Sequence, residues 1–446
     1  MVNLNNSYRY TIFKILYKFL KTNTSYKLIL SSFLKKSFYT TKDKSNILNT
    51  SKGILRNRLI LDLYIDSYSS VAANKIDKKT LILLYIGIYE LLYCDYIPAY
   101  ATINTIVDIS KKKNYKSHKY INAMLRKISL KKNDVLKKNN YKSKNEELSI
   151  KYSFPLWLVD YLLKYYSFKT VEEIFKNSHL IPNISFRVNT IKFSIKKIKD
   201  TFEKKGIKYK QNEINKDYFT IDKIGNKIIS EMLNNGYIYI QNPASGFIVD
   251  YFNPLEGDFI LDACSAPGGK SSYINQQTNN NSSLICLENN LNRINKLKAN
   301  ISNLSIENVE FEIADARFFK YRKKFDKILV DVPCSSSGTI RKSPDIKWSL
   351  ARDHLTNLKN NQYDILNNLS RCLKKNGEIM YSTCSILNDE NENIINKFLD
   401  KNKNFSIKPC IDKKFKKFIN NLGGLTILPI KDEYEGMFAV KMVKND

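Results

Sequence analysis

The spacing of apolar residues predicts that the first part of the chain is helical. Up to about residue 130, apolar residues recur at helical spacing in four segments: Ile54–Ile65, Leu81–Leu92, Ile103–Ile109 and Ile121–Ile128. Almost no strand or turn signals interrupt them. We therefore expect one all-α bundle, assigned to residues 1–135.

A mixed pattern follows this helical part. A polar stretch rich in lysine and asparagine, Lys131–Asn145, is predicted to be a linker. Beyond it we expect, in order, helices at Trp157–Tyr165 and Val171–Phe175, a strand at Ile184–Val188 and a helix after Ser194. This order indicates a small α+β module over residues 146–236, which would connect the two larger parts.

Short apolar runs and helical segments alternate over residues 237–446. The expected strands are Phe259–Ala263, Leu284–Glu288, Val309–Ile313, Lys327–Asp331 and Glu378–Ser382. Helices are expected at Lys270–Asn275, Leu291–Ile301 and His354–Leu373. Continuous apolar strands separated by helices predict an α/β domain, a doubly wound, Rossmann-like parallel sheet covered on both faces. The ligand of such a domain belongs at the carboxyl ends of the strands.

Three short motifs fall at those strand ends. They are the turn Leu261-Asp-Ala-Cys-Ser-Ala-Pro-Gly-Gly-Lys270 and the cysteine motifs Asp331-Val-Pro-Cys334 and Tyr381-Ser-Thr-Cys384. One glycine-rich turn beside two thiols suggests a nucleotide-like cofactor next to a sulfur nucleophile. The three motifs are consistent with one shared site.

The glycine-rich turn differs from the known phosphate-binding loops. Cys264 stands where a P-loop needs glycine, and Pro267 removes an amide donor from the expected anion nest. The dinucleotide fingerprint is also absent. Gly268 and Gly269 would let the backbone approach a ligand that has no pyrophosphate, and S-adenosylmethionine fits that description.

Two acidic residues extend this predicted cofactor site. Glu288, at the end of the next strand, is placed for ribose hydroxyls, about 20 residues beyond the turn. Asp315, after the third strand, could meet an adenine amine. Either acid alone is more typical of an ordinary strand end or helix cap, but together with the turn they favour cofactor binding.

The two cysteines suit methylation of cytosine carbon 5. That carbon is a poor nucleophile, so a thiolate must first add at carbon 6 and create an enamine that attacks the activated methyl group. Release then requires loss of the carbon 5 proton, which a second polar group can assist. Cys334 and Cys384 meet this demand, but spacing alone leaves their order open. Val332 and Cys334 stand where methylation of an exocyclic amine would need other residues.

The composition suggests a polyanionic partner and argues against a disulfide framework and a zinc site. The 446 residues carry 73 Lys and Arg against 43 Asp and Glu, a formal charge of +30. That charge favours RNA, although the abundance of Lys, Asn, Ile and Tyr also reflects a nucleotide bias of the coding genome. Seven cysteines without framework spacing and only three histidines favour free thiols in a reducing compartment and no zinc site.

We also expect a soluble, cytoplasmic monomer without a membrane segment or a bound metal. No apolar run approaches the roughly 20 residues that span a bilayer. The first 42 residues lack Asp and Glu and could mimic a transit peptide, but their apolar residues recur at the spacing of a packed helix.

The motifs together resemble the Sun (Fmu) family of RNA cytosine-carbon-5 methyltransferases. The resemblance lies in Leu261–Ser271, in Asp331–Arg341 with Ser343-Pro-Asp-Ile-Lys-Trp348, and in Tyr381–Ser385. Gln241-Asn-Pro-Ala-Ser245 is also similar to the segment that leads into the family's catalytic domain. Taken together, these resemblances imply S-adenosylmethionine-dependent methylation of a cytosine in small-subunit (16S) ribosomal RNA.

The resemblance also implies roles for individual residues. Cys384 would be the nucleophile and Cys334 the residue that aids release, with Asp331 as a third catalytic residue. The implied cofactor contacts are Cys264, Ser265, Ala266, Pro267, Gly268, Gly269, Lys270, Glu288, Asp315 and Asp331. Two departures occur: the family usually has Asp at the position of Glu288, and Asp-Gly-Phe-Phe where this chain has Glu435-Gly-Met-Phe438.

The N-terminal helices resemble the NusB RNA-binding bundle. The similar segments are Leu84–Leu92, Ile97–Ile103 and Tyr120–Arg126. Separately, Arg341, Lys342 and Lys347, around the Pro344-Asp-Ile-Lys loop, could steer phosphates, with a solvated basic loop as the alternative. Two alternatives stay open: a noncatalytic RNA-binding or ribosome assembly factor that retains a methyltransferase shell, and a nucleotide hydrolase built on Gly269-Lys270-Ser271, which Cys264 and Pro267 disfavour.

Overall fold

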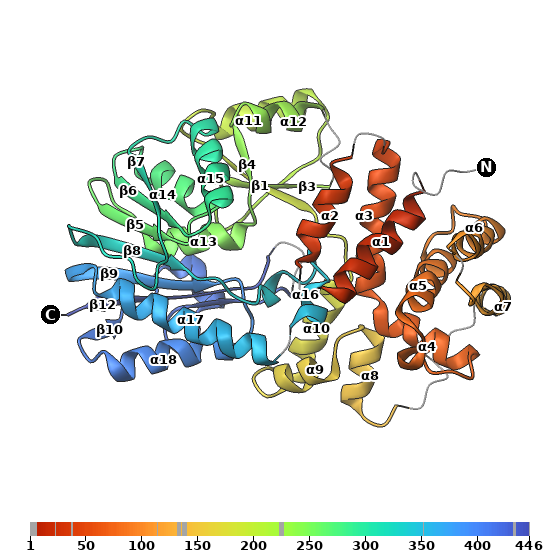
Figure 1. Ribbon diagram of the computed structural model, residues 1–446. Coiled ribbons are helices and arrows are strands. Elements are labelled where there is room, and N and C mark those ends of the chain that lie inside the picture. Colours follow the sequence, from red (N-terminus) through yellow and green to blue (C-terminus); the bar gives the residue numbers. More distant parts are fainter. Residues whose placement is uncertain are drawn as a thin grey trace. The chain divides into compact units, whose positions relative to one another are not determined.

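The computed structural model describes residues 7–22, 24–36, 39–113, 115–131, 135, 141–222, 227–350, 352–430 and 434–445 (Figure 1). The chain divides into two compact units. The first consists of Met1–His179 with Ser343–Ser349, and the second of Leu180–Lys342 with Leu350–Asp446. Among the described residues, no helix combines the length and hydropathy that a membrane span requires.

The described residues of the first unit form helices and no strand, as its apolar spacing predicts. Its helices are α1 (Tyr8–Lys21), α2 (Tyr26–Leu34), α3 (Thr41–Arg56), α4 (Arg58–Tyr68), α5 (Lys78–Tyr93), α6 (Ala99–Lys112), α7 (His118–Leu130), α8 (Lys144–Lys151), α9 (Leu156–Leu163), α10 (Phe168–Ser178) and α16 (Ile346–Ser349). Helix α5 is buried on nearly every side and packs against α1, α3, α6 and α7. A helix that is apolar all round belongs in the centre of a bundle, so α5 organises this core.

Two details of the first unit bear on the sequence predictions. The apolar segment 54–65 is divided between α3 and α4, which meet at Asn57, whose side-chain amide donates to the carbonyl of Gly53 at 2.9 Å. Most of the predicted linker Lys131–Asn145 lies outside the described residues, and α8 already begins at Lys144. The helices α8 to α10, which the sequence pattern joins to the small module, cluster with the first unit.

The small α+β module contributes a four-stranded antiparallel sheet to the second unit. Its strands are β1 (Ile184–Val188), β2 (Lys210–Gln211), β3 (Tyr218–Ile221) and β4 (Ile238–Ile240), in the order β2-β3-β1-β4. Helices α11 (Ile195–Lys204) and α12 (Lys227–Asn234) share its apolar core, in which Phe186, Phe202 and Phe219 are fully buried. The predicted strand Ile184–Val188 is confirmed.

The larger sheet has eight strands, and its centre is parallel. The strands are β5 (Phe259–Ala263), β6 (Ser283–Glu288), β7 (Val309–Ile313), β8 (Phe325–Asp331), β9 (Leu373–Thr383), β10 (Phe405–Ile407), β11 (Leu425–Ile427) and β12 (Met437–Lys444). The order is β10-β12-β9-β8-β5-β6-β7, with β11 paired to β12. Strands β5 to β9 confirm the five predicted strands and pair in parallel, as predicted.

The sheet as a whole is mixed, which corrects the expectation of a parallel sheet. Strand β12 pairs antiparallel with β9, with Val440 opposite Tyr381, and β10 and β11 both pair antiparallel with β12. Helices α13 (Pro243–Phe252), α14 (Gly269–Gln277) and α15 (Leu291–Asn303) pack on one face of the sheet, and α17 (Arg352–Ser370) and α18 (Glu392–Lys401) on the other (Figure 1). The doubly wound, Rossmann-like fold class is therefore confirmed.

Candidate active site

The sheet order brings the three strand-end motifs to one edge. Strands β5, β8 and β9 are neighbours, and β8 and β9 run in register with Asp331 opposite Ser382. Because the carboxyl ends of parallel strands meet at the same edge, the glycine-rich turn and both cysteine motifs converge there.

The two motif cysteines face each other across this edge. The sulfur of Cys334 lies 3.2 Å from that of Cys384, and the sulfur of Cys384 lies 3.3 Å from Oγ of Ser336. The amide of Gly338 donates to the carbonyl of Cys384 at 2.9 Å, which ties the loop after β8 to the loop after β9. Both thiols are half-buried.

These contacts separate the acidities of the two thiols. The hydrogen bond from Cys334 is the largest effect on Cys384 and, with that of Ser336, lowers the pKa of the Cys384 thiol although burial opposes ionisation. The same contact, together with burial, raises the pKa of Cys334 well above its usual value. When the pair loses one proton, the negative charge therefore lies on Cys384 and the remaining proton on Cys334.

An ion pair lies beside the thiols. Nζ of Lys270 is 2.7 Å from Oδ2 of Asp331, and the hydroxyl of Ser382 donates to Oδ1 of Asp331 at 2.8 Å. Burial opposes the charge of Lys270, but Asp331 outweighs it and raises the pKa of the ammonium group. Its charge also favours the thiolate of Cys384.

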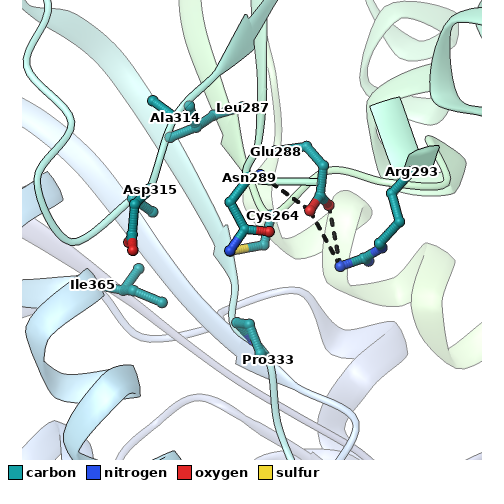
Figure 2. A pocket seen from close by; sticks show the side chains of 10 residues that line it. Cys264, Leu287, Glu288, Asn289, Arg293, Ala314, Asp315, Pro333 and Ile365 are labelled. Carbon is teal, nitrogen blue, oxygen red and sulfur yellow. Dashed lines mark hydrogen bonds and ion pairs between the residues drawn. The ribbon is translucent and has the colours of Figure 1, made fainter. Parts of the chain in front are cut away.

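A pocket opens next to the thiols, around the ends of β5, β6 and β7. It is lined by Cys264, Leu287, Glu288, Asn289, Arg293, Ala314, Asp315, Ala316, Pro333 and Ile365. Figure 2 shows Glu288 and Asp315 on opposite sides of the pocket, with Cys264 and Asn289 between them.

Glu288 is buried in this pocket with one oxygen only partly satisfied. The residue is 2% exposed, and its Oε1 accepts hydrogen bonds from the amides of Asn289 and Asn290 and from Arg293. Its Oε2 lies 3.2 Å from Nη1 of Arg293 but makes no hydrogen bond with the described residues. A buried carboxylate oxygen in this state can accept a hydrogen bond from a ligand hydroxyl.

Asp315 is held by an arginine that sequence reasoning missed. Its carboxylate accepts hydrogen bonds from the guanidinium of Arg317, the shortest at 2.6 Å from Nη2. These bonds lower the pKa of Asp315, so the carboxylate on this side of the pocket stays ionised. Arg293, five residues after Glu288, was also missed, although its position one turn into the following helix could have indicated it.

The glycine-rich turn forms the floor behind the pocket. Of Cys264–Lys270, only Cys264 lines the pocket. Ser265 donates to the carbonyl of Leu287, while the carbonyls of Ala266 and Pro267 accept hydrogen bonds from Arg293 and Asn300. Gly268 has a φ of +100°, where a Cβ would also meet Leu297 at 2.6 Å, so glycine is required at this position.

A third arginine supports the turn from the small module. Arg187, on β1, is 1% exposed, and its Nη1 donates to the carbonyl of Gly269 and to Oε1 of Gln241, both at 3.0 Å. Its Nη2 donates to the hydroxyl of Ser272 at 2.7 Å. The guanidinium also lies over the ring of Tyr273, 4.6 Å from the centroid. The small module therefore contributes directly to the shape of the glycine-rich turn.

The expectation that Arg341, Lys342 and Lys347 steer phosphates is wrong for two of the three. Lys347 is 1% exposed within the first unit, where it donates to the carbonyl of Arg56 at 2.9 Å, and burial lowers its pKa well below the usual value. Arg341 is also buried. Only Lys342 is exposed, with Glu435 at 3.6 Å. Apolar neighbours of Lys347, among them Phe154, are far away in sequence, so the motif carried no signal of its burial.

Family comparisons agree with this architecture. Residues 6–130 match the NusB family, residues 154–226 match the ferredoxin-like domain of RsmF/B-like methyltransferases, and residues 249–443 match the 16S rRNA methyltransferase RsmB/F family. Residues 249–443 therefore match the RsmB/F family of rRNA methyltransferases. The RsmB/F match contains both cysteine motifs and the whole pocket.

Individual relatives match nearly the whole length of this chain. It is 28% identical over 435 residues to the probable ribosomal RNA small subunit methyltransferase B of Bacillus subtilis, covering 95% of this chain and 96% of the relative. The crystal structure of PH0851 superposes with a TM-score of 0.80 at 24% identity, over 100% of this chain and 99% of that chain. A methyltransferase homologue from Pyrococcus horikoshii has a TM-score of 0.60 at 25% identity, over 68% and 100% of the two chains.

Proposed function

We propose that this protein transfers a methyl group from S-adenosylmethionine to carbon 5 of a specific cytosine in small-subunit (16S) ribosomal RNA, through a covalent bond between Cys384 and the base. The observation that carries the proposal is the pair of thiols, 3.2 Å apart, in which Cys384 is the more acidic member. Relatives named ribosomal RNA small subunit methyltransferase B support the substrate.

The pocket fits S-adenosylmethionine. The partly satisfied Oε2 of Glu288 suits a ribose hydroxyl, and the ionised Asp315 on the opposite side suits an adenine amine. Cys264 and Pro333 both line the pocket, and Pro333 directly precedes Cys334 in the chain. The glutamate is one methylene longer than the family's usual aspartate, and the support of Arg293 compensates by fixing its carboxylate. When bound, the cofactor would supply an electrophilic methyl group.

The residues around the thiols can carry the remaining steps. The thiolate of Cys384 adds to carbon 6, and the resulting electron density at carbon 5 takes up the methyl group. Lys270 and Asp331 offer a donor and an acceptor to the polar edge of the pyrimidine. For this attack the base must be unstacked, so we expect a flipped or unpaired cytosine.

Cys334 would accept the carbon 5 proton in the last step. Before the reaction, the neighbouring thiolate of Cys384 keeps the proton on Cys334. Once Cys384 has become a thioether, that negative charge is gone and the pKa of Cys334 falls. Cys334 can then ionise and remove the proton from carbon 5, which expels Cys384 and restores the aromatic ring.

We also propose roles for the three domains of the chain. Residues 1–135 would form a NusB-like RNA-binding domain, 146–236 a connecting or RNA-binding module, and 237–446 the methyltransferase domain. We propose that the protein works as a cytoplasmic monomer.

Transfer of a labelled methyl group tests this function. Purified protein is incubated with labelled S-adenosylmethionine and 16S ribosomal RNA that lacks the mark, and nucleosides are separated by mass. Label in 5-methylcytidine, mapped by bisulfite sequencing to one position, is the expected result. Label in another nucleoside overturns the carbon 5 chemistry, and RNA binding without any transfer favours the alternative of a noncatalytic assembly factor.

A further inference from the structure

A fully buried carboxylate is hydrogen-bonded to the loops that carry the two thiols. Glu390 ends the short 3-10 turn Asn388–Glu390 that precedes α18, and its exposed fraction is 0%. No ion pair involving Glu390 occurs among the described side chains. A buried carboxylate without a cation is destabilising unless hydrogen bonds compensate it, so its partners show what holds it there.

All four hydrogen bonds to this carboxylate come from the surroundings of the cysteine loops. Oε1 of Glu390 accepts from the amide of Ser335 at 2.8 Å and from the side chain of Gln362 at 2.9 Å. Its Oε2 accepts from the hydroxyls of Ser335 and Ser385, both at 2.5 Å. Ser335 directly follows Cys334, and Ser385 directly follows Cys384. One carboxylate therefore bridges both loops one residue beyond each thiol.

The same bridge is reinforced by a cluster of three hydroxyls. Oγ of Ser337 lies 3.1 Å from that of Ser335 and 2.9 Å from that of Ser385. The hydroxyl of Ser337 also accepts from the amide of Ile386 at 3.0 Å. Gln362, on α17, donates both to Glu390 and to the carbonyl of Pro333 at 3.0 Å. Each group that donates a hydrogen bond to Glu390 therefore either belongs to one of the two cysteine loops or is hydrogen-bonded to one.

We propose that Glu390 is a positioning residue that holds the loops of Cys334 and Cys384 in register and so sets the separation of their sulfur atoms. The hydrogen bonds of its carboxylate go neither to a thiol nor to a residue of the pocket lining, and it acts through Ser335 and Ser385. Its negative charge has a second effect, because it opposes ionisation of Cys334 and keeps the proton on that thiol. This inference rests on the proposed function for its purpose, but its geometry can be tested without RNA or cofactor.

The test measures how readily the two thiols meet. Hydrogen peroxide oxidises one thiol to a sulfenic acid with release of one water, and the partner thiol then displaces a second water to form the disulfide, so the rate at which the sulfenic acid closes to the Cys334–Cys384 bond reports the separation of the two sulfur atoms. Peptide mass spectrometry distinguishes this bond from other cysteines. The variants are Glu390→Gln, which removes the charge and keeps one acceptor, and Glu390→Ala. Asp389→Asn is the matched control, since it removes a neighbouring carboxylate charge that pairs with Lys359 at 3.0 Å.

We expect Glu390→Ala to form the Cys334–Cys384 disulfide about tenfold more slowly than the wild type, or slower still, with Asp389→Asn unchanged. In Glu390→Gln, alkylation by iodoacetamide at neutral pH should shift from Cys384 toward Cys334. Should Glu390→Ala fail to fold, the alkylation ratio in Glu390→Gln alone decides the matter. A folded Glu390 variant with wild-type disulfide rate and alkylation ratio overturns the proposal. Because these thiol measurements need no substrate, they stand even if methyl transfer to cytosine is not found.

Discussion

The sulfur of Cys384 lies 3.2 Å from that of Cys334, although the two residues are 50 positions apart in the chain. At this distance, ionisation of one thiol depends on protonation of the other, and Ser336 and Lys270 both favour the anion on Cys384. The two cysteines should therefore fail in different ways when each is replaced.

Replacement of the nucleophile should stop the reaction, whereas replacement of its partner should stop release. Cys384→Ala is expected to lose methylation, with transfer reduced to background. Cys334→Ala should still form the bond to carbon 6 and should accumulate protein covalently joined to RNA, because no thiol removes the carbon 5 proton. A denaturing gel with labelled RNA shows the joined species as a slower band. A slower band with Cys384→Ala instead would reverse the two roles.

Arg187 provides a second prediction, which concerns the cofactor turn. Replacement by Lys keeps the charge but loses the fork that reaches both Gly269 and Ser272. Since the carbonyl of Gly269 then loses a buried partner, we expect destabilisation of about 1–3 kcal/mol. Binding of S-adenosylhomocysteine should weaken about tenfold, which corresponds to about 1.4 kcal/mol.

Calorimetric titration and thermal unfolding measure the two effects of Arg187→Lys separately. Lys192→Met serves as the control, because Lys192 belongs to the same module and donates only to an exposed carbonyl, that of Asn303. Unchanged affinity in a destabilised Arg187→Lys would limit this arginine to a structural role.

Sequence analysis could predict only those features whose pattern lies within a short stretch of neighbouring residues. The strands that end at Ala263, Asp331 and Thr383 were recognisable because each is a short apolar run, and the motifs follow them directly. Strand β12 was missed, since its pairing with β9 depends on residues far apart in sequence.

The supporting residues were beyond sequence reasoning for the same physical reason. Arg187 and Glu390 look like ordinary surface charges in the sequence, and only tertiary packing buries them beside the turn and the thiols. Lys347 illustrates the opposite error, because a basic loop residue was expected at the surface and is buried. Long-range burial of a charged side chain leaves no periodic pattern for sequence analysis to detect.

Gly338 gives a third prediction, because the loop of Cys334 meets the C-terminal strand there. A Cβ on Gly338 would lie 2.3 Å from the carbonyl oxygen of Gly436 and 2.6 Å from its Cα. The amide of Gly436 donates to the carbonyl of Gly338 at 2.8 Å, so neither backbone can yield without breaking this bond. We expect Gly338→Ala to destabilise the protein by about 1–3 kcal/mol and to lower methylation strongly.

The control for Gly338→Ala separates stability from activity. Gly206 has a φ of +62° and open space where a Cβ would lie, so Gly206→Ala strains the backbone without displacing a neighbour. It should lose stability and keep its methylation rate at a temperature where the protein is folded. Equal activity in both variants would show that the contact with Gly436 does not position the thiols.

His179 gives the last prediction, on acid stability. Burial is the main cause that lowers its pKa from 6.5 to about 4, and the charges of Lys347 and Arg56 add to it. Its Nε2 lies 2.8 Å from the carbonyl of Tyr152, so the neutral ring donates there. Between pH 6.5 and 4 the unfolded chain binds a proton that the folded chain does not, and stability falls as pH falls through this window.

At about 1.36 kcal/mol per pH unit, this loss is at most about 3 kcal/mol. His179→Gln, which keeps a donor for Tyr152, should be less stable than the wild type at about pH 7.5 but should lose less on acidification. Urea unfolding at about pH 7.5 and about pH 5 measures the difference, with His118→Gln as the control for removing an imidazole elsewhere. If His179→Gln loses as much stability as the wild type between these two pH values, protonation of His179 is not the source of the acid sensitivity.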